Sequence, residues 1–148
     1  MMDALFAYAH YLAIIGTGAF LTAELIVCRR GLSADQVRLL PRLDVAFFSS
    51  ALLALGTGLI RLFFYAKGLG FYLPNPIFWV KMALYVTIAL ISIAPTMRFI
   101  RWAKALGAAA TMPSEAEVLA TRRLIHLELM LLALLPLAAA LMARGIGL

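Results

Sequence analysis

The chain has 148 residues, of which 65% are hydrophobic and only 14% are charged, and its formal net charge at pH 7 is +6. Soluble domains carry nearer a quarter charged residues, so this composition argues against a water-soluble fold and predicts one domain in a lipid bilayer. In a soluble protein the positive charge would favour nucleic-acid binding. Here the basic residues lie between apolar runs, where they set membrane orientation, and no nucleic-acid partner is expected.

The first apolar run, residues 4–27, is long enough for one membrane span and is read as a retained first helix. His10, Thr17 and Glu24 recur every seven residues in this run and therefore share nearly one helix face. A polar stripe at this depth is costly unless it faces other helices, water or a cofactor. The single cysteine, Cys28, excludes an internal disulfide and is expected at the inner membrane face.

The second span is predicted over residues 44–65, with Asp44 near the N-terminus of its helix, where the helix dipole favours a carboxylate. Residues 31–42 before it are predicted to be a short connection, in which Ser33 caps a single amphipathic turn. The motif Gly-Thr-Gly occurs in both of the first two spans, at residues 16–18 and 56–58. Both copies are expected near mid-membrane, where small residues allow close helix packing or leave room for a flat cofactor.

Two further spans are predicted over residues 77–100 and 122–143. The connection before the third span is rich in Gly, Pro and aromatic residues and reads as an interfacial aromatic belt. A helix capped by Ser114 is expected to continue into the fourth span, where Pro136 is expected to produce a kink. These patterns predict an all-α fold, an integral membrane four-helix antiparallel bundle without a soluble domain.

The basic residues are distributed unevenly between the two ends of the predicted bundle. The first and third connections with their flanks hold nine of the 13. Cytoplasmic loops carry the excess of Lys and Arg, so both termini are predicted outside, facing the periplasm of a bacterial inner membrane. The nine are Arg29, Arg30, Arg38, Arg42, Arg98, Arg101, Lys104, Arg122 and Arg123.

Depth divides the ionisable residues of the spans into two groups. The outer group is His10, Arg61 and Lys81, and no carboxylate is expected at its level. Either both cations extend to the outer headgroups, or the three hold an anionic or electron-rich ligand such as porphyrin propionates, a quinone head group or a lipid phosphate. The inner group mixes both signs and is predicted to form structural ion pairs that fix helix ends. It comprises Glu24, Arg42, Asp44, Arg122, Arg123, His126 and Glu128.

Several motifs resemble those of a bacterial family of predicted four-span membrane proteins of unknown function. They are His10 with Glu24 and a following Arg, then residues 42–44, 58–61, 75–81 and 144–145. More distantly, the early His, the Gly-rich second span and the Trp79-Val80-Lys81 segment resemble HemJ-type protoporphyrinogen oxidases and the membrane part of CopD-type copper proteins. The HemJ resemblance implies haem b with His10 as iron ligand and Lys81 at the haem or substrate site.

Three functional hypotheses follow. The first is a haem-b-binding redox protein with its site near the outer membrane face. The second is a non-catalytic accessory or scaffold subunit, as a homo-oligomer or within a larger membrane complex. The third is a small transporter that uses Glu24 and His126.

Overall fold

The computed structural model describes residues 1–65 and 67–147, and helices dominate it. Four of them are long and apolar enough to cross a membrane, which confirms the predicted all-α membrane fold. The helices are α1 (Met2–Val27), α2 (Ala34–Ile60), the π-helix η1 (Arg61–Tyr65) that continues α2, α3 (Leu69–Tyr72), α4 (Pro76–Ala109) and α5 (Glu115–Ala143).

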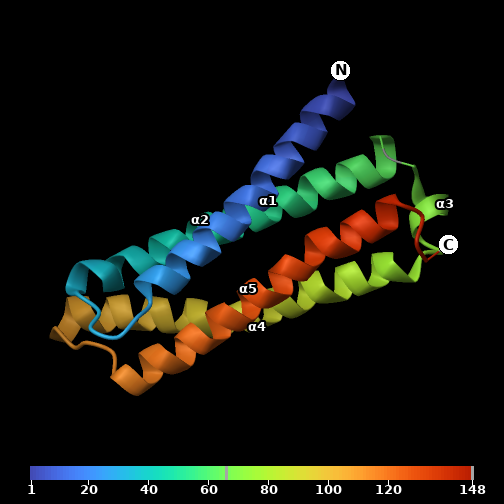
Figure 1. Cartoon of the computed structure of the whole chain (residues 1–148). Coiled ribbons are helices and arrows are strands. Elements are labelled where there is room, and N and C mark those ends of the chain that lie inside the picture. The colour runs from blue at the N-terminus through green and yellow to red at the C-terminus, as the bar shows by residue number, and fades with distance from the viewer. Residues whose placement is uncertain (66, 148) are drawn as a thin grey trace.

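The four long helices form two hairpins, in which α1 packs chiefly on α2 and α4 on α5 (Figure 1). The connections within the hairpins, residues 28–33 and 110–114, lie at one end of the bundle, which we call the loop end. Both chain termini lie at the opposite end, the termini end, because Asp3 contacts Arg61 and Asn75 bonds Ile146 there. Which end faces the cytoplasm stays a prediction from the charge distribution.

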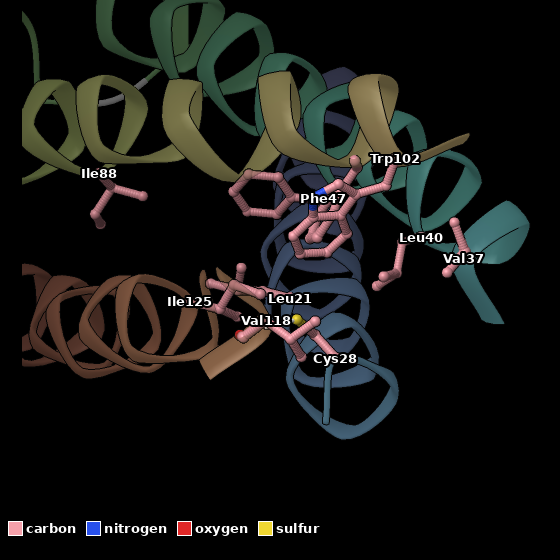
Figure 2. Close-up of a cluster of buried hydrophobic side chains, with 10 residues drawn as sticks. Leu21, Cys28, Val37, Leu40, Phe47, Ile88, Trp102, Val118 and Ile125 are labelled. Carbon is pink, nitrogen blue, oxygen red and sulfur yellow. Dashed lines mark hydrogen bonds between the residues drawn. The ribbon is translucent and has the colours of Figure 1, made fainter. Parts of the chain in front are cut away.

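The hydrophobic core is concentrated towards the loop end (Figure 2). There, buried side chains from α1, α2, α4 and α5 gather between the two hairpins. Towards the termini end the N-terminal part of α1 diverges from α5 (Figure 1). The core residues are Leu21, Cys28, Val37, Leu40, Phe47, Ile88, Phe99, Trp102, Val118 and Ile125.

Two helices, α2 and α4, extend well beyond the predicted spans. The helix that was expected to start near residue 44 begins at Ala34, because Ser33 and Gln36 form a reciprocal capping box. Burial of Val37 and Leu40 in the core holds the helix together past Pro41, which lacks an N–H. Asp44 consequently lies in the interior of α2, and the prediction that it stands near the helix N-terminus is wrong.

The third span continues to Ala109 instead of ending near residue 100, since Phe99 and Trp102 bury their rings at the loop end. The fourth helix begins at Glu115, capped by Ser114 as predicted, and runs without a break to Ala143. With 34 residues, α4 is on the order of 50 Å long and exceeds a hydrocarbon core of about 30 Å. Its last turns and the first turns of α5 therefore reach beyond the apolar layer.

The contact between α1 and α2 follows an antiparallel register. A Cβ added at Gly16 would lie 3.0 Å from Ser50 Oγ, and one added at Gly58 would lie 3.0 Å from His10 Cε1. The two Gly-Thr-Gly motifs do allow close approach of the helices, but they lie at different levels and face other residues. In the same register, Glu24 of α1 comes opposite Asp44 of α2.

Candidate functional site

His10 is held against α2 by a side-chain hydrogen bond. Its Nδ1 lies 3.0 Å from Thr57 Oγ1, and that hydroxyl donates its own proton to the Leu53 carbonyl at 2.6 Å. Both bonds form together when the ring donates from Nδ1–H, because the hydroxyl has only one proton, and in this tautomer Nε2 is the unprotonated nitrogen. Gly58 makes the fit possible, because its missing Cβ leaves room for the imidazole edge. The half-buried ring thus offers a lone pair on Nε2.

Arg61 reaches the same region from η1, where the chain changes from α- to π-helix. Single π turns occur often at functional sites, because they redirect the side chains that follow. Arg61 Nε lies 3.8 Å from Asp3 Oδ1, and the guanidinium carbon lies 5.8 Å from the Tyr11 ring centre. The expectation of no carboxylate at this level is therefore wrong: Asp3, in the first turn of α1, partly offsets the charge of Arg61. The antiparallel register of α1 against α2 is the signal that could have predicted this contact between Asp3 and Arg61.

Lys81, on α4, is the third member of the predicted outer group. Its side chain is half-buried, and it lies within electrostatic range of Arg61 and of the His10 ring. Within the described residues, Lys81 forms no ion pair with a carboxylate. Three side chains from three different helical segments thus lie within electrostatic range of one another, and Lys81 is the cation among them without a carboxylate partner in the described residues.

An apolar cavity lies deeper between the hairpins, one helical turn along α4 from Lys81. It encloses about 130 Å³ and is lined by residues of α1, α2, α4 and α5, with Thr17, Tyr85 and Ser92 as its polar members. The Tyr85 hydroxyl donates to the Ala51 carbonyl at 2.8 Å, so its polarity is satisfied within the helices. The cavity therefore offers a largely apolar surface beside the outer group.

The predicted ion pairs of the inner group are not formed among the described residues. Arg122 donates instead to the carbonyls of Leu25 and Cys28, which lack helical partners at the end of α1. Arg42, Arg123 and His126 are exposed on the bundle surface. The ion pairs that do form at the loop end are Arg30–Glu115, Arg38–Asp35 and Arg101–Glu117, and none of them was predicted.

Among the residues that the structure describes, three carboxyl groups lie inside the bundle without a cationic partner. Glu24, Asp44 and Glu128 are each at most 5% exposed and lie within electrostatic range of one another. Asp44 accepts a hydrogen bond from Thr96 at 3.1 Å, whereas one oxygen each of Glu24 and Glu128 is buried without a hydrogen-bond partner. We call these three residues the carboxyl cluster. Among the described residues, no group of His, Cys, Asp or Glu is arranged to hold a metal ion.

His126 does not join this cluster. It lies two residues before Glu128 on α5, and positions two apart point roughly 200° away from each other around a helix. Glu128 is buried and His126 is exposed, in line with that geometry. The transporter hypothesis uses both Glu24 and His126, and of these two residues only Glu24 is buried inside the bundle.

Comparison with known families covers nearly the whole chain. The family model described as predicted membrane protein (DUF2214) matches residues 2–147. The chain belongs to the DUF2214 family. This agrees with the predicted membership of a family of membrane proteins of unknown function, whereas the HemJ and CopD resemblances stay predictions. No curated protein and no solved structure matches this DUF2214 chain.

Proposed function

We propose that the chain is a haem-b-binding redox protein of the cell inner membrane, with His10 as the iron ligand. The observation that carries the proposal is the bond between His10 Nδ1 and Thr57, because donation from Nδ1–H in this bond would leave Nε2 as the basic nitrogen. Histidines that bind metals characteristically donate their other ring N–H to a protein oxygen, which fixes the tautomer and the ring orientation. His10 has this arrangement.

The charges around His10 suit the anionic edge of a porphyrin. Lys81 has no carboxylate partner in the described residues, and Arg61 shares its charge with the exposed Asp3. Either cation can bind a propionate, Arg61 through its planar fork and Lys81 as a point charge. A quinone-like head group would use the same cations. Haem is favoured over a quinone because its iron would also use the unprotonated Nε2 of His10 as a ligand.

Haem b, when bound, supplies one-electron chemistry whose potential follows from its axial ligands and the polarity around it. The residues of the chain would hold the ring, keep His10 in one tautomer and balance the propionate charge. His126 cannot supply a second axial ligand in one chain, because it is exposed and lies in the half of α5 nearer the loop end, whereas His10 lies near the termini end.

A visible spectrum of the detergent-purified protein, expressed with ample haem supply, tests this proposal. We expect a Soret band and a reducible α band in the wild type, loss of both in His10→Ala, and retention in His126→Ala. Haem lost from His126→Ala but kept in His10→Ala would overturn the site. A haem-free wild type would favour the alternative of a non-catalytic accessory subunit.

A second candidate function, proton or cation transfer, is favoured by the two partnerless oxygens of the carboxyl cluster. Buried carboxyl groups without cationic side chains persist either as protonated acids or as ligands of a cation. In this version of the transporter hypothesis Asp44 and Glu128 replace His126 as partners of Glu24. Proteoliposomes that enclose a pH dye would show proton flux in the wild type and none in Glu24→Gln. Equal flux in both would exclude the cluster from transport.

A further inference from the structure

A basic recess lies on the surface of the loop end, separate from both sites described above. Its volume is about 380 Å³, and it is lined by Leu119, Arg122, Arg123 and His126 of α5 together with Arg30, which follows α1. On α5 these residues are three, four and seven positions from Leu119, so they share one helix face. Four of the five lining side chains can donate hydrogen bonds.

Positive charge in the recess exceeds the negative charge that the chain supplies. Arg30 is paired, since its Nε lies 3.0 Å from Glu115 Oε1. Arg122 is held by the carbonyl oxygens at the end of α1, including Cys28 O at 3.0 Å, and has no carboxylate partner in the part of the chain that the structure describes. Arg123 and His126 are exposed and form no hydrogen bond or ion pair with the described residues. Two guanidinium groups and one imidazole are therefore available to an anion.

The level of the recess in the bundle matches the headgroup region of a bilayer. Arg30 lies just beyond α1, whose 26 residues span roughly 39 Å and so exceed the hydrocarbon core by a few ångströms at each end. Towards mid-membrane, Leu127 and Met130 on α5 are exposed, and each lies four residues beyond a lining residue, Arg123 or His126, on the same helix face. A ligand seated here would meet cations at one end and apolar side chains at the other.

We propose that this recess binds an anionic phospholipid, with its phosphate at Arg122 and Arg123 and an acyl chain along Leu127 and Met130. The apolar flank is the reason to choose a lipid over free phosphate, which shares the headgroup chemistry but gains nothing from exposed apolar side chains. Basic pockets between helices at the cytoplasmic face are suited to anionic headgroups. The site is independent of the haem proposal, because it involves neither His10, Arg61 nor Lys81.

The probe for the test is phosphatidylglycerol, added to the full-length protein in a neutral detergent, with bound lipid measured by native mass spectrometry. We expect retention of phosphatidylglycerol at lower concentrations than phosphatidylcholine, and an apparent Kd about tenfold weaker in Arg123→Gln, in keeping with one lost charge-assisted hydrogen bond. Arg123→Lys should weaken binding less. Lys104→Gln is the matched control, since it removes an exposed cation from the same end outside the recess.

Arg122 is left intact in these variants because it also holds the end of α1. Equal retention of phosphatidylglycerol and phosphatidylcholine, or an unchanged Kd in Arg123→Gln, would overturn the proposal. Sodium phosphate at millimolar concentration should not displace the lipid. Displacement by it would identify a free-anion site and would also refute a lipid site.

Discussion

Replacing Thr57 by Val tests the contact that orients His10. The side chains are nearly isosteric, so the change removes the hydroxyl that accepts from His10 Nδ1 and donates to Leu53. Thr17→Val is a matched control: Thr17 is 5% exposed against 6% for Thr57, and its hydroxyl also donates to the carbonyl four residues earlier. The two substitutions therefore lose the same local bond, and only Thr57→Val also loses the bond to His10.

A hydrogen bond contributes about 1 kcal/mol net, and a half-buried donor left unsatisfied costs a similar amount. We therefore expect Thr57→Val to lower the free energy of unfolding by about 1 kcal/mol more than Thr17→Val, measured by SDS titration in mixed micelles. A double-mutant cycle with His10→Ala should give a coupling energy of about the same size. Nitrogen NMR of the imidazole should show that the strong Nδ1–H preference is lost. Equal costs of the two Val variants, with no coupling, would refute the assigned bond and tautomer.

Four further predictions concern other parts of the fold. Ala110 caps α4 with a φ of 50°, so Ala110→Gly should raise the free energy of unfolding by about 1 kcal/mol, whereas Ala105→Gly, inside the helix, should lower it by a similar amount. Glu24→Gln should leave stability unchanged or raise it in the same SDS titration, since no ion pair is lost; a cost of about 3 kcal/mol would reveal a hidden cationic partner. Burial raises the pKa of the Cys28 thiol to about 11, so maleimide should label it slowly at pH 8 in the folded protein and fully after denaturation. In intact cells an impermeant maleimide should label Lys67→Cys and not Asp35→Cys, and the opposite pattern would reverse the orientation derived from the basic residues.

The four membrane spans could be predicted from sequence because apolar length is a local property. The helix ends were less predictable, since tertiary burial decided them. Phe99 and Trp102 extend α4 because partners from other helices cover their rings at the loop end. Val37 and Leu40 likewise sustain a helix through Pro41, although the proline alone favours a break.

The outer group could be predicted because depth is read directly from residue numbers. The partner of His10 could not, since Thr57 meets it only through the register of α1 against α2. The prediction of ion pairs in the inner group was wrong for a different reason. Counting charges at one level ignores the carbonyl groups at the end of α1, which compete for Arg122. It also ignores helix faces, which turn His126 outwards and Glu128 inwards.

Side chains are more deeply buried towards the loop end than towards the termini end, so substitutions at the loop end should destabilise the fold more. Large side chains such as Leu21, Phe99 and Ile125 are fully buried towards the loop end, and truncating one of them costs about 2–5 kcal/mol. His10 and Lys81 are only half-buried towards the other end, where α1 diverges from α5. Ligand sites are commonly built in the less stable part of a fold, because binding and release require local movement. Variants at His10 and Lys81 should therefore fold well enough that a lost ligand can be separated from a lost structure.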